Sequence, residues 1–211
     1  MNCRSQQKII ILAITLLVFS VSALAADISD FPPCHSPACK SIAEKKSWPT
    51  TQSKDVQKIE FYGFQLSIPK GSVETRSNAR FRQFDFDNKR WISVSVFERS
   101  DTDELFKASK YTMVDWADIV YTQTPADKIP ETEAEAFAWY SVLMSKVVFV
   151  GQNHVVQYKN KPLVVYSIND SLSGNKTLMI VSSKFPRILV KMEVYGFNEA
   201  AELKLIAGLS S

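Results

Sequence analysis

Apolar and polar residues alternate regularly from residue 59 onward, where the chain first shows a firm strand pattern. In the run from Phe64 to Ile68, apolar residues recur at every second position, so they point to one side of a strand. Gly63 before this run allows a tight chain reversal, and Pro69 closes the strand because it has no N–H to donate. The pattern predicts a β-hairpin over residues 59–69, onto which the later elements pack.

Six later segments also have strand patterns. They are rich in aromatic and β-branched residues and are separated by turn residues: 81–86, 91–97, 155–158, 163–168, 177–181 and 188–195. In the second of these, Ile92, Val94 and Val96 share one face, which is typical of a half-buried antiparallel strand. The segment 163–168 is apolar on both faces, which predicts a central strand covered on both sides.

Between and after these strands the apolar residues recur at helical spacing. Asp101 and Glu104 resemble a capping box that opens a helix reaching about residue 121, and Thr132 and Glu135 repeat the signal for a second helix. Residues 147–150 fit either a helix or a strand, and Asn198 caps a final helix. We expect an α+β fold in which one curved antiparallel sheet of about six strands is covered by helices, an α/β/α sandwich.

This order of elements resembles that of the PsbP-like superfamily, which includes the bacterial periplasmic DcrB proteins. The resemblance covers residues 58–211 and rests on the opening Phe-Tyr-Gly-Phe-Gln-Leu-Ser-Ile-Pro and on the closing strand and helix of residues 189–209. It implies non-enzymatic docking to other proteins as an accessory, assembly or adaptor module. The length of residues 58–211 separately predicts one domain with a full core. It supplies no catalytic residue that could be carried over to this chain.

Residues 1–25 have the pattern of a secretory signal peptide. Arg4 and Lys8 precede an almost entirely apolar run, and small residues at Ala23 and Ala25 fit a cleavage site. The alternative is an uncleaved membrane anchor, because the apolar run approaches the minimum length of a spanning helix. We expect cleavage and export to the periplasm, with no membrane span in the mature chain.

Residues 26–57 are rich in Pro, Ser and Lys, which predicts a polar leader outside the core. Cys34 and Cys39 are the two cysteines left after processing, and in an oxidising compartment they most simply form a local disulfide. Metal or redox chemistry with His35, or free thiols, are the alternatives. So short a loop contributes roughly 2 kcal/mol in the entropy model, so we expect its reduction to leave the domain nearly as stable.

The remaining composition argues against several classes of function. Removing Arg4 and Lys8 leaves 23 basic and 22 acidic residues, so the chain has no dense basic surface for nucleic acid. The arginines at 76, 80 and 82 read as a solvated strand edge. With six glycines and no phosphate-binding loop, the sequence gives no sign of a cofactor.

Candidate catalytic groups are few. The chain has two histidines, and His154 fits an ordinary strand end better than a catalytic triad. Five carboxylates could pair as general acid and base or bind calcium, although turns and helix caps explain them more simply: Asp85, Asp87, Asp101, Asp103 and Glu104. We expect no enzyme and no metal site.

Two aromatic residues stand out as possible interface residues. Trp91 and Phe97 lie opposite the row of Ile92, Val94 and Val96, so either a helix or a partner protein must cover them. The sequence therefore favours an exported, non-enzymatic protein-binding domain, either an immunity or inhibitor protein or an envelope accessory factor. A hydrolase that uses carboxylates and a carrier of a small apolar ligand are the alternatives.

The mature chain is expected to begin near Ala26, because Ala23 and Ala25 fit the signal peptidase site. Intact-mass measurement or N-terminal sequencing of the exported protein checks this. Recovery of the full-length chain only after detergent extraction would contradict it.

Overall fold

The computed structural model describes residues 36–211 except 52, 88, 128–129, 131 and 171–172. Its strands are β1 (Glu44–Lys46), β2 (Val56–Phe61), β3 (Phe64–Pro69), β4 (Val73–Asn78), β5 (Phe81–Asp87), β6 (Arg90–Glu98), β7 (His154–Asn160), β8 (Leu163–Asn169), β9 (Lys176–Ser182) and β10 (Ile188–Tyr195). Its helices are η2 (Pro37–Lys40), η3 (Arg99–Asp101), α1 (Glu104–Ala108), α2 (Met113–Thr122), α3 (Glu133–Met144), α4 (Lys146–Phe149) and α5 (Glu199–Ala207).

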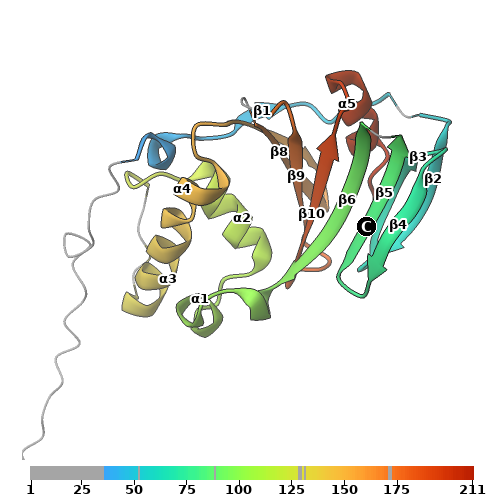
Figure 1. Ribbon diagram of the computed structural model, residues 1–211. Coiled ribbons are helices and arrows are strands. Elements are labelled where there is room, and N and C mark those ends of the chain that lie inside the picture. The colour runs from blue at the N-terminus through green and yellow to red at the C-terminus, as the bar shows by residue number, and fades with distance from the viewer. Residues whose placement is uncertain (1–35, 52, 88, 128–129, 131, 171–172) are drawn as a thin grey trace, which may run out of the picture.

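One sheet of eight strands forms the middle layer, in the order β1-β7-β8-β9-β10-β6-β5-β4 (Figure 1). Only β1 pairs in parallel, with β7, while the other neighbours in this sheet pair antiparallel. The hairpin β2-β3 is a separate two-stranded sheet. The α+β class and the mostly antiparallel sheet are confirmed.

The expected α/β/α sandwich of about six strands differs from the structure in two respects. The sheet has eight strands, and a β-hairpin shares the cover of one face with a helix. Strand β4 was missed because all six of its residues are exposed, so it carries no alternation of apolar and polar positions. Strand β1 was missed because it has three residues, Glu-Lys-Lys, all of them exposed. Both strands lie at edges of the sheet, where burial imposes no sequence pattern.

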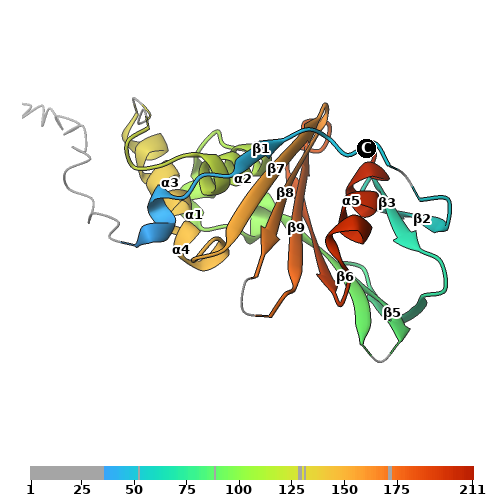
Figure 2. The same ribbon diagram turned by 90° about the horizontal axis from the view of Figure 1, so that it is seen from above.

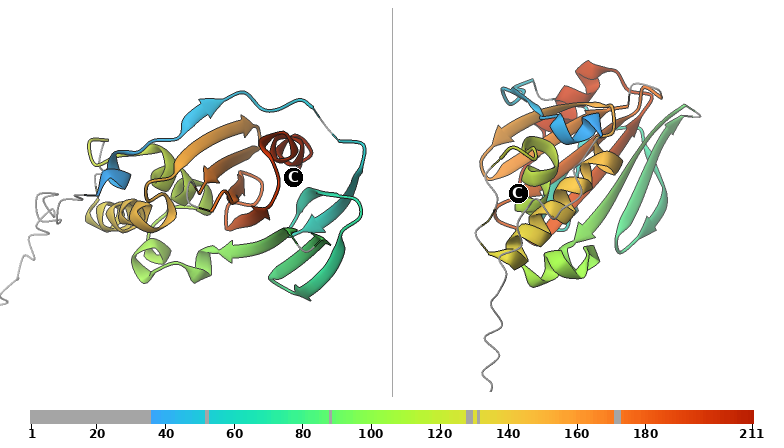
Figure 3. Two further views of the ribbon diagram at one scale, coloured as in Figure 1. Left: turned by 45° about the horizontal axis from the view of Figure 1, so that its top comes forward. Right: turned by 90° about the vertical axis from the view of Figure 1, so that its left-hand side faces the viewer.

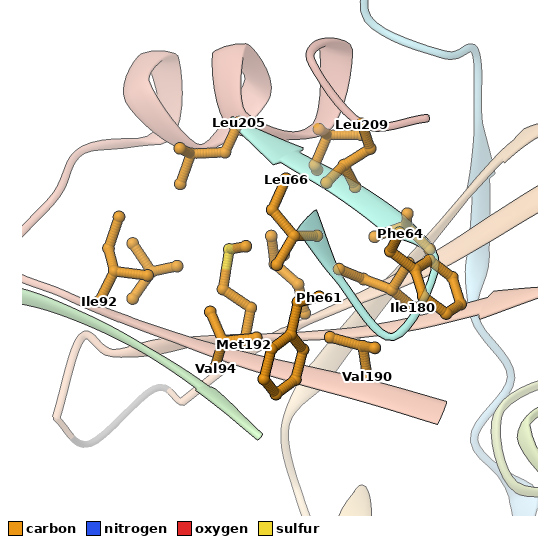
Figure 4. Close-up of a cluster of buried hydrophobic side chains, with 14 of the residues drawn as sticks. Phe61, Phe64, Leu66, Ile92, Val94, Ile180, Val190, Met192, Leu205 and Leu209 are labelled. Atoms are coloured by element: carbon orange, nitrogen blue, oxygen red, sulfur yellow. The ribbon is translucent and has the colours of Figure 1, made fainter. Parts of the chain in front are cut away.

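The hairpin and α5 cover one face of the sheet, called here the hairpin-side face. Phe64, Leu66 and Ile68 of β3 are at most 1% exposed and pack on even-numbered residues of β6 and β10. Figure 4 shows Leu66 between Leu205 of α5 and Met192 of β10. The predicted hairpin is therefore confirmed, and it acts as a lid on the main sheet.

Glycine is required where this lid meets its neighbours. Gly63 has φ +82°, and a Cβ there would lie 2.5 Å from the ring of Phe185. A Cβ at Gly208, after α5, would lie 2.2 Å from Ser67 Oγ, which donates a hydrogen bond of 2.8 Å to the Gly208 carbonyl. The backbone at Gly63 thus lies against the Phe185 ring and that at Gly208 against the Ser67 side chain, which leaves no space for a Cβ at either position.

The helices α1 to α4 lie on the other face, called here the helix-side face (Figure 2). Helix α2 packs on β9 and β10, where Met179 and Leu189 are each 2% exposed. Central strand β8 is buried on both faces, with Val165 under the hairpin and Tyr166 under the helices. The prediction of a doubly covered strand at 163–168 is confirmed.

The long helix expected between residues 101 and 121 is in fact interrupted. Asp103, not Asp101, caps α1 by accepting a hydrogen bond of 2.8 Å from the Phe106 N–H. A second capping box, formed by Thr112 and Asp115, then starts α2. Each polar cap provides a new helix start, so the chain turns between the two segments.

The structure also tests the three remaining helical predictions. Helix α3 begins as expected after Thr132, although the Thr132 side chain makes no cap bond, and Glu135 instead forms an ion pair of 2.8 Å with Lys110. Residues 146–149 form the helix α4 and not a strand. Asn198 caps α5 as predicted, by accepting a hydrogen bond of 2.9 Å from the Ala201 N–H.

The expectation that residues 26–57 lie outside the folded domain is wrong for the part that the structure describes. Helix η2 packs against α4, and Ala38 and Cys39 are at most 1% exposed. Strand β1 then extends the sheet beyond β7 (Figures 2 and 3). The polar composition concealed this packing because only a few small residues are buried.

The predicted signal peptide and Cys34 lie outside the described residues, so cleavage and the pairing of Cys34 with Cys39 stay predictions. We expected reduction of the disulfide to leave the domain nearly as stable because the cysteines would lie outside the core. That reason no longer holds, because Cys39 is fully buried. Breaking a bond to this residue would disturb a packed segment.

A buried lysine joins the N-terminal segment to the helices. Lys146 of α4 is 0% exposed, and its Nζ donates a hydrogen bond to the Ser41 carbonyl. Burial lowers the pKa of Lys146 from 10.5 to about 8, because a charged ammonium loses its hydration there, while Asp127 acts weakly in the opposite direction. Below pH 8 the folded protein therefore bears the cost of a buried charge.

This cost predicts a pH dependence of stability. Between pH 8 and 10.5 the unfolded chain holds the Lys146 proton more tightly than the folded chain, so stability rises with pH in that window. Wild type should gain about 1 kcal/mol between pH 7 and 9 relative to Lys146→Met. Urea unfolding at both pH values measures this difference.

The exposed Lys159 provides the matched control. Lys159→Met should follow the wild-type pH dependence. Identical slopes for wild type and Lys146→Met would show that Lys146 is not desolvated.

Candidate protein interface

The helix-side face of the sheet continues past the helices onto β6, β5 and β4. Cross-strand partners point to the same side of a sheet, so the register places ten side chains together in three rows and one additional position. We call this set the open face: Asp85-Trp91-Tyr195, Gln83-Ser93-Glu193 and Phe81-Ser95-Lys191, with Phe97 at the end of β6.

Most side chains of the open face are half-buried or exposed. Phe97 is 39% exposed and Tyr195 is 38% exposed, whereas their neighbours on the hairpin-side face, such as Val94, are fully buried. In the part of the chain that the structure describes, the helix that packs on this side is α2, which reaches β9 and β10 (Figure 1). The open face therefore begins where the helical cover ends.

Aromatic rings mark its two ends. The rings of Trp91 and Tyr195 stack with centroids 5.4 Å apart and an interplanar angle of 3°. Phe97 lies six residues further along β6, a distance of about 20 Å in an extended strand. Stacking holds the Trp91 and Tyr195 rings in place, so a partner would meet them already ordered.

Polar groups between these ends are also held in place. Ser93 Oγ donates a hydrogen bond of 3.1 Å to Glu193, whose other oxygen lies 2.6 Å from Lys191 Nζ. On β5 the Gln83 amide donates a hydrogen bond of 2.9 Å to Asp85. The middle of the open face therefore offers charges of both signs in fixed positions.

Phe97 also borders a cavity of about 240 Å³ between the sheet and the helices, which we call the Phe97 cleft. Its lining comes from β6, η3, the start of α1, α2, the α3-α4 junction and the two strands under α2: Phe97, Glu98, Asp101, Thr102, Asp103, Met113, Trp116, Ser145, Phe149, Met179 and Leu189. The floor is apolar, and three carboxylates lie on one side.

Trp91 and Phe97, the two residues predicted from the sequence, thus share one strand and one face. Helices lie beside Phe97 at one end of this face. At the other end Trp91 is half-buried and stacks on Tyr195, the one ring within stacking range of it among the described residues. Tyr195 was missed because the pairing of β6 with β10 joins segments about 100 residues apart. The alternation of faces along β10 was the signal that could have identified Tyr195, since it shares a face with Lys191 and Glu193.

His154 is the first residue of β7, as the sequence suggested. Its Nε2 lies 3.2 Å from Glu44, and its side chain is 60% exposed. It borders a second cavity, of about 370 Å³, beside β7, β8, β9 and α5. In this cavity the buried Glu202 accepts hydrogen bonds from Ser167 Oγ and Lys176 Nζ, so a tightly bonded polar cluster forms its wall.

The five carboxylates considered from the sequence make local structural bonds. Asp85 accepts a hydrogen bond from the Gln83 amide, and Asp103 caps α1. Glu104 forms an ion pair of 2.7 Å with Lys107. Hydrogen bonds from the Lys89 N–H and Arg90 lower the pKa of Asp87, and the Arg80 guanidinium lowers that of Asp101. A general acid needs a raised pKa, so these two shifts run against that role.

Within the described ranges, no group of three or more His, Cys, Asp and Glu side chains could hold a metal ion. Cys34 and His35 of the alternative metal site lie outside those ranges. Among the helices that the structure describes, none is long and apolar enough to cross a membrane.

Comparison with known proteins gives no family for this chain. No family model and no curated protein matches it. A crystal structure at 1.50 Å resolution of a protein from Bacteroides thetaiotaomicron aligns with 9% identity and a TM-score of 0.36, covering 70% of this chain. The chain spans 44% of the length of that protein.

The polar cluster at Glu202 should be structural. The Glu202 side chain is 4% exposed and that of Lys176 is 13% exposed, so Glu202→Gln leaves a poorly hydrated ammonium without its carboxylate. We expect a loss of about 3 kcal/mol in the free energy of unfolding, measured by urea denaturation.

The double variant Glu202→Gln, Lys176→Met tests the cause. It removes the stranded charge and keeps an acceptor for Ser167, so it should be less destabilised than Glu202→Gln alone. Equal or greater loss in the double variant would show that the pair is not coupled.

Proposed function

We propose that this protein is an exported, non-enzymatic domain that binds another protein through the open face. The observation that carries the proposal is the set of ordered aromatic and charged side chains on β5, β6 and β10, at the edge of the helical cover. Aromatic anchors around fixed polar groups are the usual composition of a protein interface.

Two roles fit such a domain. An immunity or inhibitor protein neutralises a toxin that acts in the periplasm, and an envelope accessory factor assists another exported protein. The resemblance of residues 58–211 to the PsbP-like superfamily supports docking of this general kind. The signal-peptide pattern of residues 1–25 supports a periplasmic location.

A carrier of a small apolar ligand is the second candidate, because the Phe97 cleft has an apolar floor. A carboxylate-dependent hydrolase has less support, since each of the five carboxylates named above already makes a local bond.

Substitution of the aromatic anchors tests the proposal. The full exported chain is used to capture its partner from an envelope extract of the producing cells, and the affinity for the purified partner is then measured. Trp91→Ala and Phe97→Ala should each weaken binding by about 1 kcal/mol or more, which is about fivefold in Kd. His154→Ala should leave the affinity unchanged.

Ile42→Ala is the matched control, because Ile42 is an apolar residue that is 61% exposed and lies outside the open face. Melting temperatures confirm that each variant is folded. The proposal fails if Trp91→Ala and Phe97→Ala bind like wild type. It also fails if the purified protein turns over a substrate in a way that a carboxylate substitution abolishes.

A further inference from the structure

The Phe97 cleft combines aromatic walls with an aliphatic floor. Trp116 and Phe149 meet edge to face with centroids 5.0 Å apart, and Phe97 forms part of the lining. Met113, Met179 and Leu189 are each 2% exposed. A long unbranched aliphatic group could pack here, because methionine side chains adapt to the shape of what they contact.

Negative charge lies on one side of this apolar cavity. Glu98, Asp101 and Asp103 line it, and the Arg80 guanidinium pairs with Asp101 alone among them. Asp103 accepts its hydrogen bonds from neutral groups, the Phe106 N–H and the Ser141 hydroxyl, each at 2.8 Å. Lys107 also lies near enough to Asp101 to lower its pKa, although its Nζ pairs with Glu104. Three carboxylates therefore outnumber the two nearby cations, Arg80 and Lys107, which leaves the rim negative.

We infer that the Phe97 cleft receives the side chain of a basic residue, arginine or lysine, presented by the protein partner. The inference rests on the proposed protein-binding function and adds the chemistry of the partner. The aliphatic stem of such a side chain packs on an apolar floor, and its charged end reaches carboxylates. A cation is also attracted to the faces of aromatic rings such as Trp116, Phe149 and Phe97.

The position of Phe97 favours a protein as the source of this cation. Phe97 belongs both to the cleft and to the open face, so one partner surface can reach both. The basic side chain would enter at one end, and the partner surface would then extend about 20 Å along β6 to the stacked Trp91 and Tyr195.

Single-residue probes test the cleft without the partner. The full chain carries four tryptophans, and selective labelling lets NMR follow the indole N–H signals while Nα-acetyl-arginine methylamide or Nα-acetyl-lysine methylamide is added. The Trp116 signal should shift in a saturable way for at least one of the two. Nα-acetyl-norleucine methylamide, which has the stem without the charge, should bind at least about fivefold more weakly.

The carboxylates are tested by removing charge and keeping shape. Asparagine is as good a helix cap as aspartate, so Glu98→Gln with Asp103→Asn should retain the start of α1 and weaken binding of the basic probe at least about threefold. Glu104→Gln removes a neighbouring carboxylate that is 89% exposed and outside the cleft, so it should leave binding unchanged.

Each result decides the inference. A silent Trp116 signal, or equal binding of the norleucine probe, overturns it, and equal binding assigns the cleft to apolar ligands. An unchanged affinity in the double carboxylate variant also overturns it. If these results appear while Trp91→Ala still weakens partner binding, only the basic anchor is wrong. If the probes bind as expected but Trp91→Ala has no effect on the partner, the open face is wrong.

Discussion

A sheet has two faces, and in this protein the two faces receive covers of unequal extent. The hairpin β2-β3 and α5 bury residues of strands β5 to β10 on one side, including Phe84, Ile92 and Tyr158. On the other side the helices bury residues of β7 to β10, such as Val155 and Leu189. The surface left over on β5, β6 and the outer part of β10 is the open face. Its location is therefore a consequence of layer sizes, since four short helices do not cover eight strands.

The elements that could be predicted from the sequence are those whose burial imposes a pattern. Phe64, Leu66 and Ile68 alternate because one side of β3 is in the core, and β8 is apolar throughout because both its sides are covered. Strands β1 and β4 have exposed side chains and are held by backbone hydrogen bonds to their neighbours, which any sequence can form. Periodicity could not reveal them.

The candidate site was predicted only in part for a related reason. Trp91 and Phe97 were recognisable because side chains alternate along a strand, which places both on the face opposite Ile92, Val94 and Val96. The ring that stacks on Trp91 and the helices that form the Phe97 cleft come from distant parts of the chain. Such contacts depend on strand order, which the local pattern does not contain. The capping boxes show the same limit, since Asp101 and Asp103 are both plausible caps and only the fold selects Asp103.

Order in the open face comes from bonds that the protein makes with itself. The Ser93-Glu193-Lys191 chain and the Trp91-Tyr195 stack immobilise groups that would otherwise lose rotational freedom when a partner binds. The cost of ordering these side chains is met during folding. A rigid surface of this kind suits a partner whose own shape is already formed.

The parallel pairing of β1 with β7 also has a consequence for how the protein folds. It joins Glu44 to Val156, so a loop of more than 100 residues must close before this edge of the sheet can form. Loop closure is slow compared with the hairpins that build β7 to β10 from neighbouring segments. The edge of β7 is therefore exposed for a time in every newly folding molecule. During that interval the N-terminal segment competes with any other extended chain nearby, and its attachment is the step that protects the β7 edge from such pairing.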